Sequence, residues 1–184
     1  MTSPDQPIFP ILSQRLPTIC QDDIADFDPM PPEFHYRLRS LLTREVPCGT
    51  KCTLNMCSCS GGSRGEIILL PGEREWSENV TQLKFRGDDP NRFPLAGDCH
   101  YLKGHWCQGG VFKPWDCISF PLQPKVIDGD LVPFFSKNCS IHPGDFDPVW
   151  IAERWKGWQI IHATIPRWVE LYSEIPPYEE TFNS

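Results

Sequence analysis

The residues best suited to chemistry lie in one stretch near the middle of the chain, residues 97–110, which reads GDCHYLKGHWCQGG. Two cysteines and two histidines fall within nine residues of it: Cys99, His100, His105 and Cys107. Thiolate and imidazole are the ligands that zinc prefers in proteins. The spacing matches no familiar zinc finger, so a second interpretation stays open, in which the cysteines are small buried apolar residues and the histidines lie on a hydrated loop.

A second group of cysteines lies upstream, in the segment VPCGTKCTLNMCSCSGG. The alternative to a metal site is a strand whose alternate cysteines are buried. Thiols this close together favour a metal, because a free cluster would be prone to oxidation. We therefore predict zinc as a cofactor. Its first-choice ligands are Cys57, Cys59, Cys99 and Cys107, and replacements or a second site would come from Cys48, Cys52, His100 and His105.

Composition narrows the classes of function. The chain has 184 residues, nine cysteines and a formal net charge of −7. This acidity disfavours a sequence-independent nucleic-acid binder, which needs a basic face to displace counterions. No apolar run is long enough to cross a bilayer, and the first residues lack the basic start and the apolar segment of a signal peptide. We therefore expect a protein of a reducing compartment, neither secreted nor in a membrane.

A short pattern near the N-terminus is suited to binding a partner. In LPTICQDDI, residues 16–24, the residues Leu16, Cys20 and Ile24 recur every four positions and would share one face of a short helix. The pattern L-x3-C-x3-aliphatic resembles the core of an elongin-binding box, which inserts leucine and cysteine into an apolar groove of its partner. Arg15 stands where such boxes usually have a small residue, and a pattern this short also arises by chance.

The overall pattern predicts a small α+β protein. Residues 1–30 are rich in proline and aspartate and are expected to form an extended or weakly ordered arm, and residues 176–184 an acidic, mobile tail. Residues 31–175 are expected to form a single zinc-stabilised domain with mostly antiparallel strands. Twenty prolines favour loops and short strands over a helix bundle.

Local patterns predict the individual elements. An apolar stripe behind prolines predicts a helix over residues 31–43, with His35 on its surface or at its cap. An Asp-Gly pair predicts a turn at Asp128 and Gly129. Apolar or alternating runs predict strands over residues 66–70, 80–85, 111–120 and 159–165, and a helix or a strand over 167–175. The aromatic side chains expected in the core are Trp106, Phe112, Trp115, Trp150, Trp155 and Trp158.

Enzyme signatures are absent from the sequence, which has no HExxH, GxSxG or two-glycine nucleotide motif. A small cysteine hydrolase would have to pair Cys99 or Cys107 with His100 or His105. A catalytic cysteine and its histidine usually come from distant parts of a chain. We therefore expect a protein without catalytic activity.

Four groups of motifs follow one another over residues 46–165. They are Val46-Pro47-Cys48 with Cys52-Thr53-Leu54, then Cys99-His100 with Gly104, Cys107 and Gly109-Gly110, then Val126-Ile127-Asp128-Gly129, and last the aromatic run 157–165. In this order they resemble the adenovirus early-region-four thirty-four-kilodalton protein family, particularly its shorter, avian-adenovirus-like members. No single motif is specific, so the order carries the resemblance.

The resemblance implies a non-enzymatic viral early regulatory protein of the host nucleus and cytoplasm that binds zinc. It implies an adaptor that recruits host elongin B/C and a cullin ubiquitin ligase, so that host proteins are degraded. Two departures limit it. Tyr101 stands where the family has a second cysteine, for which His105 would substitute, and an acidic tail replaces the arginine-rich C-terminal helix. The family's usual viral partner and nuclear retention are therefore not carried over. The alternatives are a zinc-bearing nucleic-acid-binding module and a small Cys/His enzyme.

Overall fold

The structure is a computed structural model. It describes residues 24, 26–44, 66–85, 92–94, 102–103, 106–107, 110–136, 139 and 141–175, with the backbone alone at 66, 92–94, 102–103 and 106–107. Within these residues, helices combine with antiparallel two-stranded sheets, so the predicted α+β class is confirmed. The tail predicted over residues 176–184 lies outside the described part.

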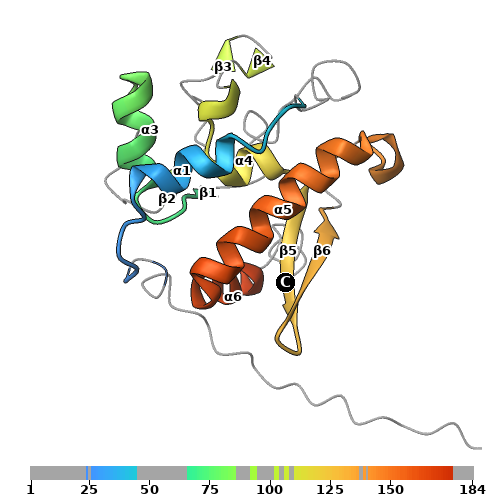
Figure 1. Cartoon of the computed structure of the whole chain (residues 1–184). Helices are drawn as coiled ribbons and strands as arrows, with labels where there is room; N and C mark the ends of the chain where they lie inside the picture. The colour runs from blue at the N-terminus through green and yellow to red at the C-terminus, as the bar shows by residue number, and fades with distance from the viewer. Residues whose placement is uncertain are drawn as a thin grey trace, which may run out of the picture.

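The helices and strands follow one another along the chain in the order seen in Figure 1. They are α1 (Pro32–Arg39), β1 (Glu66–Ile68), α3 (Glu73–Thr81), β2 (Arg92–Pro94), β3 (Leu102–Lys103), β4 (Trp106–Cys107), the 3₁₀ turn η2 (Gly110–Phe112), α4 (Trp115–Ser119), β5 (Leu122–Ile127), β6 (Asp130–Phe135), the 3₁₀ turn η3 (Pro143–Asp145), α5 (Pro148–Thr164) and α6 (Pro166–Glu174). Strand β1 pairs with β2, β3 with β4 and β5 with β6, all antiparallel. A helix within residues 31–43, a strand within 66–70 and the Asp128-Gly129 turn are confirmed, although α1 ends at Arg39, four residues before the predicted end. The run 167–175, predicted as a helix or a strand, is helical as far as Glu174.

Proline begins helices in this fold. Pro32, Pro148 and Pro166 open α1, α5 and α6, and Pro114 immediately precedes α4. The first N–H groups of a helix have no acceptor within the helix, so a proline there loses no hydrogen bond, and its fixed φ already suits the helix. The expectation that the prolines favour loops and short strands is therefore wrong at these positions.

The strand predicted over residues 159–165 is wrong, because residues 159–164 form the C-terminal part of α5 and Ile165 caps it. The buried residues of α5 recur every three or four positions, which is the period of one helix face: Trp150, Arg154, Gly157, Trp158 and Ile161. Asp147 caps the helix by accepting a hydrogen bond from the N–H of Val149 at 2.8 Å. The strand prediction fails because two adjacent isoleucines outweigh this longer period in a short window.

Two further strand predictions are wrong. Over residues 80–85, α3 continues to Thr81, and Gln82 then ends the helix in a left-handed conformation with φ 59°. Over residues 111–120, the turn η2 is followed by α4, because Pro114 is an extended residue that starts a helix instead of interrupting a strand. In both runs the alternation of side chains is too short to distinguish a strand from a helix end.

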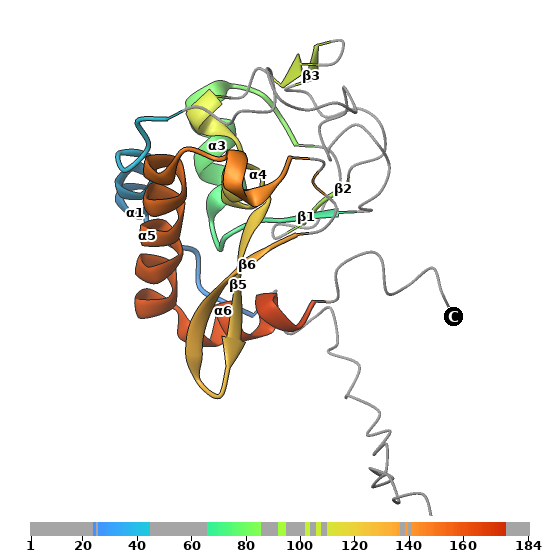
Figure 2. The same cartoon turned by 90° about the vertical axis from the view of Figure 1, so that its right-hand side faces the viewer.

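One main core joins the N-terminal and C-terminal halves of the described chain. Its buried residues come from α1, β1, α4, α5 and α6 and from the segments beside them: Ile24, Phe34, Leu38, Ile68, Leu70, Trp115, Ile118, Trp158, Ile161, Trp168, Val169, Leu171 and Tyr172. Helices α5 and α6 pack against β5, and the tip of the β5–β6 hairpin projects beyond α6 (Figures 1 and 2). A smaller cluster lies under the start of α5: Leu122, Ile141, Phe146 and Trp150.

The predicted aromatic core is confirmed in part. Trp115, Trp150 and Trp158 are each at most 1% exposed. Trp155 is half-buried against both clusters. Phe112 is 38% exposed, so its predicted burial is wrong; it lies on the short η2 turn, and its ring centroid is 6.3 Å from that of Trp76. The side chain of Trp106 lies outside the described residues.

The arm predicted over residues 1–30 joins the core at its described C-terminal end. Ile24 is 2% exposed in the main core, and the side chains of Phe27 and Met30 pack against that core. The N–H of Met30 donates a 3.0 Å hydrogen bond to the carbonyl oxygen of Pro71. The extended or weakly ordered state predicted for the arm is therefore wrong for this end, because its apolar residues find a buried position.

Candidate functional site

Most of the predicted metal ligands lie outside the described residues: Cys48, Cys52, Cys57, Cys59, Cys99, His100 and His105. Cys107 lies in β4, of which the structure describes the backbone. Its register partner is Leu102, and Lys103 pairs with Trp106. This pairing folds the Cys107 end of the central stretch back beside the strand that follows Cys99 and His100 in sequence.

Of the residues predicted to bind a partner, the structure describes only one. Leu16 and Cys20 lie outside the described residues. Ile24 is described and buried in the main core, where it packs among apolar residues of the helices. In the folded chain, therefore, the side chain of Ile24 is not available on the surface for a partner.

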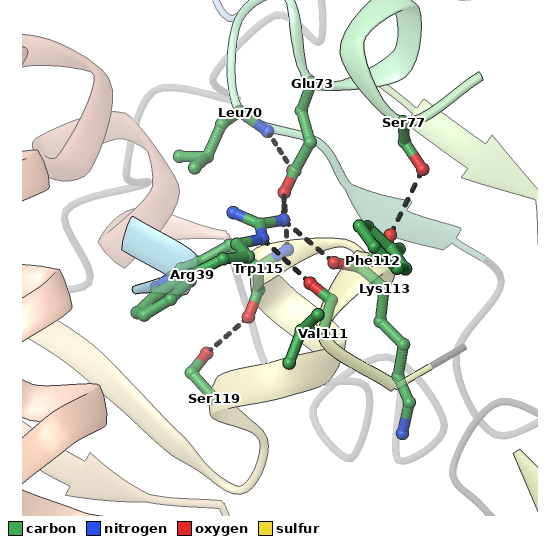
Figure 3. Close-up of polar contacts among 9 residues, drawn as sticks. All are labelled: Arg39, Leu70, Glu73, Ser77, Val111, Phe112, Lys113, Trp115 and Ser119. Carbon is green, nitrogen blue, oxygen red and sulfur yellow. Dashed lines mark hydrogen bonds and ion pairs between the residues drawn. The ribbon is translucent and has the colours of Figure 1, made fainter. Parts of the chain in front are cut away.

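A buried ion pair between α1 and α3 is the polar centre of the described residues (Figure 3). The side chains of Arg39 and Glu73 are 5% and 0% exposed, and the guanidinium nitrogen Nη2 donates to Oε1 of Glu73. Glu73 also accepts the backbone N–H of Leu70 at 2.9 Å and that of Trp115 at 2.7 Å. The carboxylate thus fixes the start of its own helix and the start of α4.

The same arginine holds the segment that follows the central cysteine–histidine stretch. Arg39 donates from Nε to the carbonyl oxygen of Val111 at 3.2 Å and from Nη2 to that of Lys113 at 2.8 Å. Its guanidinium carbon lies 4.7 Å from the ring centroid of Trp76 and 5.6 Å from that of Trp115. Charge-assisted hydrogen bonds and cation–π contacts therefore tie η2 to the α1–α3 pair.

A second charged contact holds the segment that precedes the first cysteine group. Glu153 in α5 accepts the N–H groups of Thr43 at 3.0 Å and Arg44 at 3.3 Å. The neighbouring Arg154, which is 2% exposed, donates to the carbonyl oxygen of Arg44 at 2.5 Å. Burial raises the pKa of Glu153, but the hydrogen bonds from residues 43–44 and the charge of Arg154 outweigh it and lower this pKa below its ordinary value.

The pKa of Arg154 shows how strongly this contact is desolvated. Burial lowers the pKa of Arg154 to about 10, although the Glu153 carboxylate opposes the shift. The arginine is still charged at neutral pH, so the pair acts as an ionic clamp on the backbone of residues 43–44. We call it the Glu153–Arg154 clamp.

A second buried carboxylate, Asp116 in α4, connects the two halves of the core. It accepts the hydroxyl hydrogen of Tyr172 in α6 at 2.6 Å and the N–H of Ile68 in β1 at 3.3 Å. Buried polar groups need such partners to offset the loss of water. Glu73, Glu153 and Asp116 therefore each join segments that are distant in sequence.

His35 is a titratable group whose position the sequence does not predict. It is 0% exposed, so the expectation of a surface or capping residue is wrong. Its ring stacks on Trp76 with centroids 5.4 Å apart and meets Phe34 edge-on at 5.8 Å. Burial lowers its pKa to about 4. The sequence holds a partial signal for the position of His35, because His35 precedes Arg39 by four residues and therefore lies on the same face of α1.

Within the residues that the structure describes, no group of three or more histidine, cysteine, aspartate or glutamate side chains could hold a metal ion. None of the described helices is both long and apolar enough to cross a membrane. Comparisons of the chain with protein-family models, with curated proteins and with solved structures find no significant match. The functional argument therefore depends on the motifs of the sequence and on the contacts above.

Proposed function

We propose that this chain is a zinc-stabilised, non-enzymatic viral early protein that acts as an adaptor. In this role it recruits host elongin B/C and a cullin ubiquitin ligase, so that a host protein is degraded. The order of the cysteine and histidine motifs, and the family resemblance that this order carries, support the zinc and the adaptor role. The net charge of −7 favours protein partners over nucleic acid.

One structural observation supports a scaffold that presents the two cysteine-bearing stretches. Charged side chains hold the backbone on the N-terminal side of the first stretch, at Thr43 and Arg44, and on the C-terminal side of the second, at Val111 and Lys113. Fixed ends reduce the conformational entropy that is lost when a chain closes around an ion. Zinc binding by ligands from both stretches would then add directly to the stability of the fold.

The zinc content of full-length protein purified without a chelator tests the metal. We expect at least one zinc per chain and a marked fall in Tm when the metal is chelated, because structural zinc couples binding to folding. Cys99→Ser with Cys107→Ser should lower the zinc content. Cys139→Ser, which changes a cysteine outside the proposed ligands, should not. Wild-type protein that holds well under one zinc per chain would end the zinc proposal.

Recovery of elongin B/C on the immobilised chain tests the adaptor role. Leu16→Ala with Cys20→Ala should weaken binding by roughly 2–4 kcal/mol, which is enough to abolish a micromolar complex in a pull-down. A matched control, Ile8→Ala with Leu12→Ala, changes two apolar residues of the same arm outside the pattern and should leave recovery unchanged. Full recovery with the double variant would rule out this segment as the docking site.

Binding measurements on the same purified protein distinguish the adaptor from the nucleic-acid-binding module. Binding to DNA or RNA that weakens steeply with added salt, together with no recovery of elongin, would favour a nucleic-acid module. Elongin recovery without such binding would favour the adaptor. Zinc content does not discriminate between the two, since both readings use the same cysteines.

A further inference from the structure

His35 is buried in a way that only its neutral form tolerates. Neither ring nitrogen has a hydrogen-bond partner of normal geometry, and the ring stacks on Trp76 and meets Phe34 edge-on. Buried polar atoms of this kind are rare, and a charge without partners at the same place is much more costly. Uptake of a proton by His35 therefore works against the contact between α1 and α3.

The charged groups that face His35 do not offset this cost. Arg39, from α1 itself, repels a protonated imidazole, and Glu73, from α3, attracts it. The Glu73 carboxylate is already occupied by Arg39 and by two backbone N–H groups. The carbonyl groups of Met30 and Pro71 also favour the charged ring, but neither completes a hydrogen bond of normal geometry with it. Burial dominates, and the pKa of His35 is lowered to about 4.

Helix α1 is short and depends on its neighbours for stability. It has eight residues and no side-chain cap at its N-terminus. Isolated helices of this length are unstable in water, so α1 depends on its packing against α3 and the core. By contrast, α5 has seventeen residues and a side-chain cap from Asp147. Local opening therefore begins more easily at α1 than at α5.

We propose that His35 is an acid-sensitive latch: proton uptake by its imidazole opens α1 away from α3 while α5, α6 and the β5–β6 hairpin stay folded. In the closed state the ring is neutral and stacked on Trp76. In the open state the ring is protonated and hydrated, and the Arg39–Glu73 ion pair is broken. Opening would expose the ring of Trp76, which is 4% exposed in the closed state.

The direction and the size of the pH effect on opening follow from the linkage between proton binding and the stability of the closed state. The pKa is lower in the closed state, so the closed state is fully stable above the ordinary value of 6.5 and loses stability as the pH falls from there towards 4. Between pH 7.5 and pH 5 the equilibrium constant for opening should rise about 30-fold. Below pH 4 both states bind the proton and the effect saturates.

Hydrogen exchange of the full chain, measured at pH 7.5 and pH 5 and corrected for the intrinsic effect of pH, tests the latch. The amides of α1 should lose protection by about 30-fold, while those of α5 change little. His35→Phe keeps an aromatic ring against Trp76 and should abolish this loss. His142→Asn, which changes an exposed histidine and keeps an acceptor at the start of η3, should behave as wild type.

Two results would overturn the latch. One is an equal loss of protection in α1 and α5, and the other is an acid response in His35→Phe that matches wild type. If His35→Phe fails to fold, the imidazole of wild-type His35 can be titrated by NMR. A pKa well below 6.5, with α1 amides shifting in step, supports the proposal, and a pKa at or above 6.5 refutes it.

Discussion

Gly157 in α5 lies directly against the ring of Trp115 from α4, and replacing it with alanine tests the packing of the main core. A Cβ atom at this position would lie 2.1 Å from Cζ2 and 2.3 Å from Cη2 of Trp115, whereas ordinary van der Waals contact begins at about 3.4 Å. The Trp115 ring is fully buried and meets the Trp158 ring edge-on, with centroids 6.3 Å apart. The backbone N–H of Trp115 is also held by Glu73. The ring therefore cannot retreat without disturbing its neighbours.

The expected cost combines two opposing effects. Forcing extra atoms into a well-packed core costs typically about 1–3 kcal/mol, and an overlap of more than an ångström with a rigid ring belongs at the upper end. Alanine in place of glycine inside a helix gains about 1 kcal/mol. Gly157→Ala should therefore lower the free energy of unfolding by about 2 kcal/mol. With a urea dependence of about 2 kcal/mol per molar, the midpoint would fall by about 1 M.

Urea unfolding at pH 7, with the zinc concentration held constant, measures this cost. Ala152→Gly, at an exposed position of the same helix, measures the propensity term separately and should cost about 1 kcal/mol. Trp115→Phe removes both overlapping ring atoms, so Gly157→Ala in that background should be neutral or stabilising. A Gly157→Ala protein as stable as wild type, or a cost that persists in the Trp115→Phe background, would refute the proposed overlap.

Two further substitutions test the buried charges. Glu73→Gln should lower the free energy of unfolding in urea by about 3–5 kcal/mol, because it leaves the Arg39 charge buried and unpaired. The matched change Glu170→Gln, in an ion pair exposed to solvent, should lower it by no more than about 1 kcal/mol. Equal losses of stability would contradict this account. Glu153→Gln should cost about 1–3 kcal/mol at pH 7. Hydrogen bonds lower the pKa of Glu153 in the folded state, so its contribution to stability is complete above the ordinary pKa of 4.5 and is lost as the pH falls through the lowered pKa. If the destabilisation caused by Glu153→Gln instead stays constant into strong acid, that result counts against the clamp.

The elements that the sequence predicts correctly are those whose signals are local. The helix over 31–43 follows from an N-terminal proline and an apolar stripe, and the structure places Phe34 and Leu38 of that stripe in the core. The β5–β6 turn follows from Asp128 and Gly129, which adopt positive φ values of 53° and 86°. Such signals are properties of a few neighbouring residues, so no tertiary contact is needed to read them.

The strand errors arise where tertiary packing decides. In α5 the buried face includes Arg154 and Gly157, which a hydrophobic pattern counts as breaks. Arg154 is buried because it binds the backbone of Arg44, and Gly157 because it makes room for Trp115. Both reasons depend on residues more than forty positions away in the sequence, so no window of the α5 sequence contains them.

The buried polar contacts have the same limitation. The sequence shows that Arg39 and Glu73 exist, but their pairing requires the C-terminal end of α1 to meet the first turn of α3. His35 is buried for the same reason, because it lies on the side of α1 that faces Trp76. By contrast, the predicted zinc ligands rest on clustering along the chain, and that prediction stays open.

Ile24 sets a physical limit on how the N-terminal box can bind elongin. Its side chain is 2% exposed, and burial of an isoleucine stabilises a fold by about 1.5–3 kcal/mol. A partner that pulls Ile24 out of the core must therefore recover more than this free energy in its own contacts with the side chain. We therefore expect elongin to bind through Leu16 and Cys20 while Ile24 stays in the core. The amide of Met30 reports this, because it donates to the carbonyl oxygen of Pro71 only when this segment is docked. Its hydrogen-exchange protection should be unchanged when elongin B/C is added, and a loss of protection would mean that binding extracts Ile24 from the core.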